Sequence, residues 1–399
     1  MVWTRSPLVT MTHATLPRPT LLPGLTRLWR DRHTLQLGLD PGRAVLLEVA
    51  NPRAVRLLDL LDGAHSERHI LDHATRIRVD RDDARSLLET LRAAGLVVAA
   101  HTLLPTGLAD PDRARLTDEA DALALNAADL PGTPAQVLRR RRAARVVVSG
   151  GGRLGGPVAV ALAQAGVGHV EPDLGGRVRP ADLVGAGLLP TDVGRHTAEA
   201  VADAIARTAA STVTRPVRRR RADLVVQVGV DRPAALLAAG FARRRQPHLM
   251  LALRDGVPVI GPLVRPPVGP CLNCLDLHRL DRDPAWPALA AQLAGDDPAP
   301  ACGVATLLAA VALATAESLS HVDGGVPETV GAAIEVAGAG RFGRRFWPPH
   351  PDCGCGHSVR RARRAAPATG PVASARPTPL PRARQQSSTE AARSVTMAG

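Results

Sequence analysis

Apolar and polar positions alternate in short segments through the first hundred residues. Residues 34–39 and 44–49 predict two strands joined by a turn at Asp40-Pro-Gly, and helical periodicity follows at 52–61, 67–75 and 81–94. A hairpin followed by three short helices predicts a small winged-helix-like domain, which we place at residues 31–105. We expect residues 1–30, rich in proline and threonine, to form a flexible leader.

From residue 144 onward the pattern changes to β-branched runs that alternate with helical segments. The run Arg145-Val-Val-Val enters a glycine-rich loop and then a helical pattern at 157–165. Further strands and helices follow in alternation, at 168–171, 197–208, 223–228, 234–243, 249–253 and 257–264. This order predicts an α/β fold with a Rossmann-like, doubly wound sheet over residues 144–358. Residues 106–143 then form a connector, and residues 359–399 a disordered basic tail.

The glycine loop has the spacing Gly150-x-Gly152-x-x-Gly155 between a predicted strand and a helix. In such a loop the first glycine allows the tight turn, the second lets a phosphate approach the backbone, and the third lets helix and strand pack closely. Glu171 and Asp173, at the end of the next strand, are candidates for binding ribose hydroxyls. For the glycine loop, the alternative is that the protein keeps the nucleotide-binding fold but no longer binds the nucleotide. For Glu171 and Asp173, the alternative is that both are solvent-exposed loop residues without a ligand.

Four of the five cysteines form two short-spaced pairs, Cys271 with Cys274 and Cys353 with Cys355. Zinc binds four thiolates in a tetrahedron, and two such pairs on separate segments can supply its four corners. We therefore predict a structural zinc site, with His350 as a reserve ligand because the second pair is unusually tight. Two disulfides or unrelated buried thiols are the alternatives.

The formal net charge is +13, but residues 358–399 contain eight arginines against one glutamate, so the rest of the chain is only mildly basic. Few aromatic residues are present on which bases could stack, so nucleic acid is an unlikely partner. The N-terminus lacks a signal-peptide pattern, and the apolar run 303–316 is too short to span a bilayer. We expect a cytoplasmic protein without membrane contact, which also favours metal over disulfides.

The ordered set of motifs over residues 140–358 resembles the ThiF family, the ubiquitin-activating-like adenylyltransferases of sulfur-carrier and molybdopterin pathways. The motifs are Gly150-Gly-Gly-Arg-Leu-Gly-Gly-Pro-Val, Ala165-Gly-Val-Gly-His-Val, Asp192-Val-Gly-Arg-His-Thr-Ala-Glu, Gly269-Pro-Cys-Leu-Asn-Cys and His350-Pro-Asp-Cys-Gly-Cys. The resemblance implies a homodimer with one structural zinc per subunit, and ATP- and magnesium-dependent adenylation of a carboxylate.

Several residues depart from that family's pattern. The chain contains no lysine, and the family's phosphate-binding lysine aligns with Arg195. The metal-binding aspartate is absent or shifted by one position to Asp231, and a phosphate arginine is missing after Asp182. Asp231 and Arg195 are weak candidates for surviving ATP chemistry. Cys302, ahead of a predicted helix, is a third weak candidate, because a helix N-terminus can lower a thiol pKa. Packing of a small buried side chain at the helix start is the alternative, and we favour it.

The small first domain mixes acidic and basic residues and has no basic recognition helix, so it favours peptide capture along a strand edge over DNA binding. A small domain followed by a degenerate ThiF-like domain resembles actinobacterial leader-peptide-binding partner proteins of azole-forming pathways. That resemblance implies a scaffold that presents a ribosomal precursor peptide to a YcaO-type cyclodehydratase. An active adenylyltransferase and a DNA-binding regulator are the alternatives.

Overall fold

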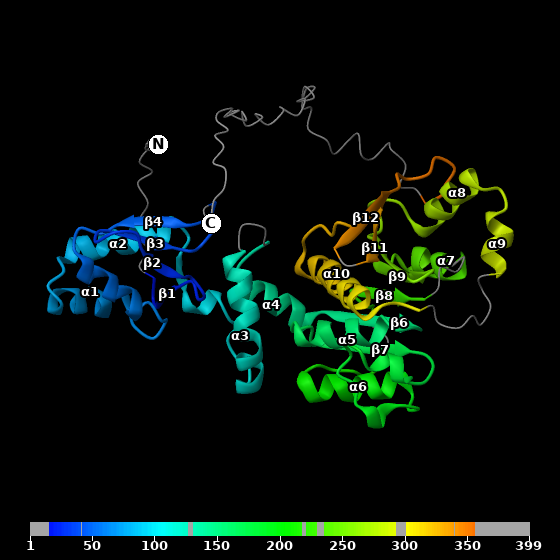
Figure 1. The fold of residues 1–399 in the computed structure, drawn as a ribbon, viewed down its shortest axis with the longest axis horizontal. Coiled ribbons are helices and arrows are strands. Elements are labelled where there is room, and N and C mark those ends of the chain that lie inside the picture. The colour runs from blue at the N-terminus through cyan, green and yellow to red at the C-terminus, as the bar shows by residue number, and fades with distance from the viewer. Residues whose placement is uncertain are drawn as a thin grey trace, which may run out of the picture. The chain divides into compact units, whose positions relative to one another are not determined.

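The structure is a computed structural model. The chain folds into a small N-terminal domain, a helical connector and an α/β domain (Figure 1). The structure describes residues 16–40, 42–126, 131–217, 221–229, 235–292, 301–338 and 340–355. The expected tail at 359–399 lies outside the described residues.

The N-terminal domain combines two small antiparallel sheets with three helical segments. One sheet has the order β2-β3-β4, and the other pairs β1 with β5. The element bounds are β1 Pro19–Leu21, β2 Arg27–Trp29, β3 Thr34–Leu37, β4 Val45–Glu48, η1 Pro52–Leu60, α1 Glu67–Arg76, α2 Arg81–Ala93 and β5 Val97–Ala99.

The predicted hairpin and three helical segments of this domain are confirmed, and the first segment is a 3₁₀ helix. Caps explain where two of the helices begin: the Ser66 hydroxyl accepts from the backbone of His69, and the Asp80 carboxylate accepts from Asp82 and Asp83. The expectation of a leader over 1–30 is wrong for its last part, because β1 and β2 lie within it. The buried β1 completes the domain core through its pairing with β5.

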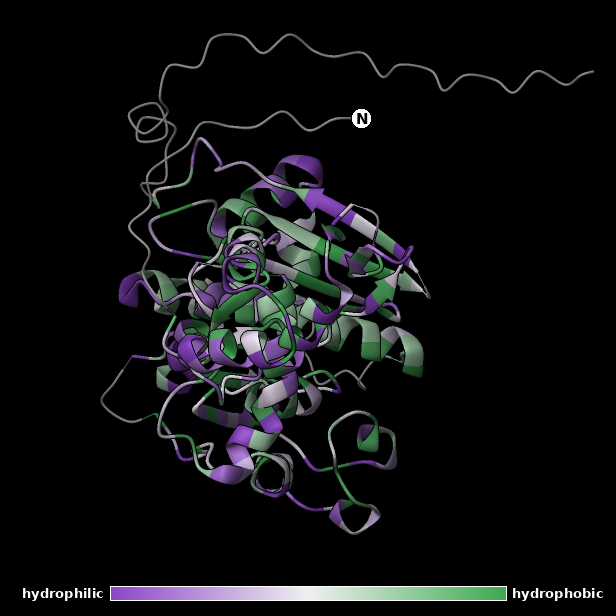
Figure 2. Ribbon diagram, turned by 90° about the vertical axis from the view of Figure 1, so that its left-hand side faces the viewer, coloured by the Kyte–Doolittle hydropathy of each residue, from purple (hydrophilic) through white to green (hydrophobic). Residues whose placement is uncertain are grey.

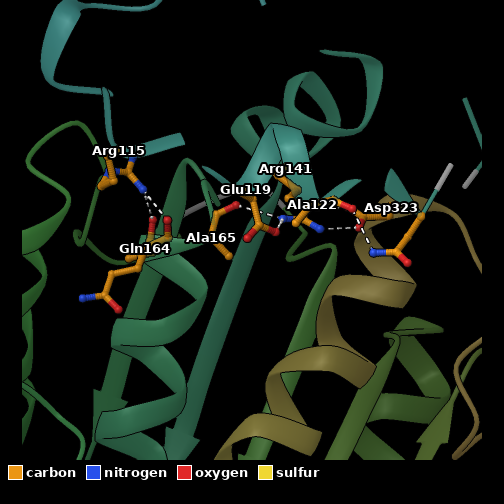
Figure 3. A network of polar contacts seen from close by, with 9 residues as sticks. Arg115, Glu119, Ala122, Arg141, Gln164, Ala165 and Asp323 are labelled. Carbon is orange, nitrogen blue, oxygen red and sulfur yellow. Dashed lines mark hydrogen bonds and ion pairs between the residues drawn. The ribbon is translucent and has the colours of Figure 1, made fainter. Parts of the chain in front are cut away.

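The connector is helical, as α3 Asp110–Leu125 and α4 Pro134–Ala143 follow the short η2 Ala100–Thr102. The side chain of Arg141 is 3% exposed and makes two hydrogen bonds to the carboxylate of Asp323, at 2.8 and 2.9 Å. It also binds Glu119 and the carbonyl of Ala165, as Figure 3 shows. One buried guanidinium therefore joins the connector to the ends of two helices of the α/β domain.

The α/β domain contains a mixed seven-stranded sheet of order β12-β11-β10-β9-β8-β6-β7. The strands β7, β6, β8 and β9 are parallel, and β10, β11 and β12 extend the sheet in antiparallel pairs. Their bounds are β6 Arg145–Gly150, β7 His169–Leu174, β8 Leu224–Val228, β9 His248–Arg254, β10 Val257–Val264, β11 Ala332–Gly338 and β12 Arg341–Phe346. The predicted α/β fold is confirmed, with a parallel centre and an antiparallel flank.

Helices cover both faces of this sheet because alternate strand residues point to opposite sides. On one face α5, α6 and α10 share a core with Leu224 and Val226, and on the other α7 and α8 pack near Val225. The helix bounds are α5 Gly155–Gln164, η4 Pro180–Leu183, η5 Pro190–Asp192, α6 Thr197–Thr208, α7 Ala235–Arg244, α8 Leu272–Arg282, α9 Trp286–Gln292 and α10 Val304–Asp323. Figure 2 shows the strands at the centre of the view coloured largely green, as hydrophobic residues.

By length and composition α10 is long and apolar enough to cross a membrane, and it is longer than the apolar run seen in the sequence. Its buried residues, however, belong to the core of the α/β domain. Leu307 and Ala310 pack in the same apolar cluster as the central strands. This packing is that of a core helix of the sheet domain.

Candidate functional site

A cavity of about 800 Å³ lies at the carboxyl ends of the parallel strands. Its walls come from the glycine loop after β6, the segment after β7, and the ends of β8 and β9. Ligands bind at this edge in open parallel sheets, where the strand order reverses. Here the reversal falls between β6 and β8, because the chain passes from β6 outward to β7 and then back to β8.

The glycine loop is shaped by its lack of side chains. Gly150 has φ +115°, and a Cβ atom there would lie 1.8 Å from the carbonyl oxygen of Val228. A Cβ at Gly155 would lie 2.6 Å from the side chain of Leu174, so this glycine lets α5 pack closely against β7. Gly152 has φ +105° and faces open space within the cavity wall. The loop thus has the form predicted for phosphate contact at the N-terminus of α5.

Of the two acidic candidates for ribose binding, Asp173 lies at the cavity and Glu171 does not. Asp173 lines the cavity, and its Oδ2 accepts a hydrogen bond of 2.7 Å from the Ser149 hydroxyl on the neighbouring strand. Glu171 accepts a hydrogen bond of 2.7 Å from the backbone of Val217. Asp173 is therefore the side chain of the two that can meet a ligand hydroxyl.

Three arginines line the same cavity, and sequence reasoning did not identify them as site residues. Arg153 donates to the carbonyl oxygens of Cys302, at 2.7 Å, and Ala181, at 3.2 Å. Arg177 donates to the Gly194 carbonyl at 2.7 Å. Arg153 stands inside the glycine loop, and Arg177 follows the strand that carries Asp173, so their positions in the sequence were an available signal.

Arg179 is the third of these arginines, and it forms an ion pair with Asp182, which also lines the cavity. Burial raises the pKa of Asp182, but hydrogen bonds and the positive charge of Arg179 outweigh that effect and hold the pKa below its usual value. Arg153 and Arg177 form no direct ion pair among the described residues, although the charge of Arg153 also helps to lower the pKa of Asp182. Three arginines against Asp173 and Asp182 make the cavity favour an anionic ligand.

Arg195, another predicted candidate for ATP chemistry, lies away from the cavity. Arg195 is not among the residues lining the cavity, and its guanidinium binds the carboxylates of Asp203, at 2.7 Å, and Asp192, at 2.6 Å. Those two bonds raise the pKa of Arg195. Arg195 compensates the charge of the buried Asp192, and the carboxylates of Asp192 and Asp203 both hold its guanidinium. Asp231 lies outside the described residues.

Cys302 precedes α10 as predicted, and the pKa of its thiol is raised, which opposes the nucleophile alternative and agrees with packing. Partial burial raises the pKa of Cys302, although the charge of Arg153 opposes the shift. Its Sγ lies 3.6 Å from the carbonyl oxygen of Gly303, and the side chain packs against the core of the α/β domain. A raised pKa leaves less thiolate, so the residue has the environment of a packing thiol.

The four paired cysteines come together as a single cluster. The Sγ atom of Cys271 lies 3.8 Å from that of Cys274 and 3.6 Å from that of Cys353, and Cys274 lies 3.7 Å from Cys355. A tetrahedral zinc with Zn–S bonds of about 2.3 Å separates its sulfurs by about 3.8 Å. All four cysteines are free thiols at positions that fit the metal, so the geometry opposes the disulfide alternative.

The surroundings shift the pKa values of two of these thiols in opposite directions. Burial opposes ionisation, but a hydrogen bond of 3.2 Å from the Asn273 amide helps to lower the pKa of Cys353 to about 7. Burial raises the pKa of Cys271. Bound zinc would hold all four as thiolates and would supply a crosslink between the start of α8 and the segment after β12.

His350 does not serve as the reserve ligand that the sequence suggested. Its Nε2 lies 2.8 Å from Oδ2 of Asp281, and its Nδ1 accepts a hydrogen bond of 3.1 Å from the backbone of Asp352. Both ring nitrogens are engaged, and the imidazole is 6% exposed. His350 therefore fastens the second cysteine pair to α8, while the four sulfurs complete the metal site.

A third feature is the open edge of β4 in the N-terminal domain. Among the described residues β4 pairs only with β3. The backbone of Val49 donates to the His33 carbonyl. Because every second residue of an antiparallel strand bonds to a given partner, Leu47 and Val45 also face β3, whereas the backbone N–H and C=O groups of Leu46 and Glu48 point away from it. These outward groups can accept a further strand.

Comparison with solved structures finds the same fold in proteins of low sequence identity. E. coli MccB in complex with MccA-N7isoASN has a TM-score of 0.60 and 16% identity, over 85% of this chain and 99% of that chain. The microcin C7 biosynthetic enzyme MccB in complex with N-formylated MccA has a TM-score of 0.59 and 16% identity, with the same coverage. A heterocyclase in complex with substrate and cofactor has a TM-score of 0.54 and 16% identity, over 84% of this chain and 38% of that chain.

No protein-family model matches the sequence, and no curated protein matches it. The likeness to MccB spans nearly the whole of that chain and more of this one than the sheet domain alone, so it includes the N-terminal part. The ThiF-like motifs thus predicted the right class of architecture. The chain has the fold of MccB and of part of a heterocyclase, an α/β fold with a mixed sheet and a four-cysteine cluster that fits zinc.

Proposed function

We propose that this protein is a cytoplasmic scaffold that binds the leader of a ribosomal precursor peptide and presents it to a YcaO-type cyclodehydratase. The open edge of β4 is the observation that carries the proposal. An extended peptide can add to such an edge through main-chain hydrogen bonds, with its side chains giving specificity. The α/β domain, crosslinked by zinc at the four cysteines, would then form a homodimer and bind the modifying enzyme.

Two comparisons support this role. Structures of MccB include complexes with MccA, and the heterocyclase structure contains its substrate. The fold shared with the heterocyclase accounts for 38% of that chain.

The edge of β4 offers a sharp test with the full chain and a labelled leader from a precursor gene beside its own. The N–H of Leu46 points outward, so Leu46→Pro removes a donor to the added strand while the ladder to β3 stays intact. We expect Leu46→Pro to weaken leader binding at least tenfold in fluorescence anisotropy. Leu46→Ala keeps the N–H and is the matched control, with a smaller loss. Equal binding by wild type and Leu46→Pro would exclude peptide addition at β4.

The arginine-lined cavity favours a second candidate, an active adenylyltransferase in which arginines replace the family's lysine. Arg153 and Arg177 would bind the phosphates, Asp173 a ribose hydroxyl, and magnesium would need an acidic residue such as Asp231. Pyrophosphate exchange that depends on a carrier protein or peptide, and is lost in Arg153→Ala, would establish this activity. ATP binding without exchange would favour the scaffold.

A further inference from the structure

One cross-strand row on the outer face of the β2-β3-β4 sheet has an exposed leucine at each end and the polar Gln36 between them, and it reaches the open edge. The register places Leu28 opposite Gln36 and Gln36 opposite Leu46. Leu28 is 41% exposed and Leu46 is 50% exposed, whereas the neighbouring Leu35 and Leu47 point into the domain core. The row therefore stops at Leu46 with an apolar side chain that has no neighbour on its outer side among the described strands.

The next outer-face position of β4 is an acidic residue. Glu48 is exposed and lies opposite Thr34, and no ion pair to its carboxylate is found within the described part of the chain. Arg30, the basic residue in the same cross-strand row, donates instead to the side chain of Gln36 at 2.8 Å. The negative charge of Glu48 thus faces the edge uncompensated.

We propose that the peptide segment bound along β4 carries an apolar residue opposite Leu46 and a basic residue opposite Glu48, two positions apart on one face. The inference rests on the proposed peptide capture and specifies which peptides the site selects. Residues opposite one another in adjacent strands have Cβ atoms about 5 Å apart, close enough for apolar contact and ion pairing. The spacing of two holds for either strand direction, because side chains of one face recur at every second residue.

The charge preference should be large enough to measure. A basic residue opposite Glu48 gains an attractive pair, and an acidic residue there meets a like charge. We expect about a tenfold affinity difference between peptides that differ only at this position, decreasing with added salt. The apolar position should tolerate Val, Ile, Leu or Phe, since the row around Leu46 is open to solvent.

A random-heptapeptide display library, selected against the full chain, tests the proposal and does not require the natural leader to be identified. The selected peptides should share an apolar and a basic residue with a spacing of two. One such peptide is then synthesised with lysine or with glutamate at the basic position and titrated by anisotropy. Wild type should prefer lysine about tenfold, and Glu48→Lys should prefer glutamate.

Asp118→Lys is the matched control, because Asp118 is exposed on α3 and its replacement changes the net charge equally. That variant should keep the preference for lysine. If Glu48→Lys still binds the lysine peptide better, the proposed specificity is overturned while peptide capture stands. If the selected peptides bind Leu46→Pro as well as wild type, they do not occupy β4, and both proposals fail.

Discussion

The buried imidazole of His248 shows how a single residue makes the stability of this fold depend on pH. It opens β9, is 3% exposed and stacks on Phe241 with ring centroids 4.3 Å apart. Nδ1 lies 2.8 Å from the carbonyl oxygen of Gln246, and Nε2 has no hydrogen-bond partner in the part of the chain that the structure describes. Desolvation therefore lowers the pKa from 6.5 to about 4.

We expect acid to destabilise the α/β domain through this residue. The unfolded chain binds a proton on His248 near pH 6.5, whereas the folded chain does so only near pH 4. Stability is thus complete above about pH 6.5 and is lost as the pH falls toward 4, by up to about 3 kcal/mol. Urea unfolding at pH 7 and pH 5 should show the loss. In His248→Asn, which does not titrate, the difference between the two pH values should shrink; an unchanged difference would assign it to other groups.

At the scale of elements, Arg141 fixes the helical connector to the α/β domain. Its partners lie on α3, at the end of α5 and at the end of α10, as Figure 3 shows. Arg115 adds a second link by donating to the carbonyls of Ala163 and Gln164. Both arginines thus satisfy carbonyl groups at the C-terminus of α5, where a positive charge also favours the helix dipole.

Removing one partner of the buried Arg141–Asp323 ion pair should strongly destabilise the folded protein. Arg141→Met leaves Asp323 buried without its cation and should lower the free energy of unfolding by about 3–5 kcal/mol. Arg139→Met, in the same helix but exposed, should change it by less than about 0.5 kcal/mol. The double variant Arg141→Met/Asp323→Leu should recover part of the loss, because no buried charge then lacks a partner. Equal stability of Arg141→Met and wild type would show that the pair contributes nothing.

The elements that the sequence predicted well are those with a local signal. Apolar periodicity marked β6, β8 and α6, and glycine spacing marked the loop between β6 and α5. The strands β1 and β2 were missed because each has three residues and β1 pairs with β5, far along the chain. The strand β12 is mostly exposed and arginine-rich, so it lacks the apolar alternation on which strand prediction depends.

In the candidate sites, too, features with a local sequence signal were predictable and features that depend on the fold were not. The cysteine cluster was predictable because its members form two closely spaced pairs, and the position of Asp173 at the cavity because it lies near the end of a strand. Arg195 was assigned by its position in a motif, but the motif does not show that the guanidinium binds Asp192, three residues earlier, and Asp203 on α6. Arg153 reaches Cys302 across a long sequence separation, and no local pattern contains that contact.

At the scale of the whole molecule, the cysteine cluster joins the start of α8 to the chain after β12, so it links the two ends of the antiparallel flank of the sheet. Because it lies on elements that do not line the cavity, we expect zinc to support the fold and not the chemistry. Cys274 is fully buried. Cys274→Ser should lower bound zinc, measured by elemental analysis, and lower the free energy of unfolding by at least about 2 kcal/mol. A strong chelator should destabilise wild type in the same way.

Cys302→Ser is the matched control, because it removes a thiol outside the cluster and should leave both zinc content and unfolding nearly unchanged. Peptide binding separates a structural metal from a functional one. The N-terminal domain has its own apolar core, so Cys274→Ser should still bind the leader while losing any assembly that depends on the α/β domain. A variant that kept its stability and zinc-dependent assembly but lost one reaction would contradict a structural role, and would place the metal in the chemistry.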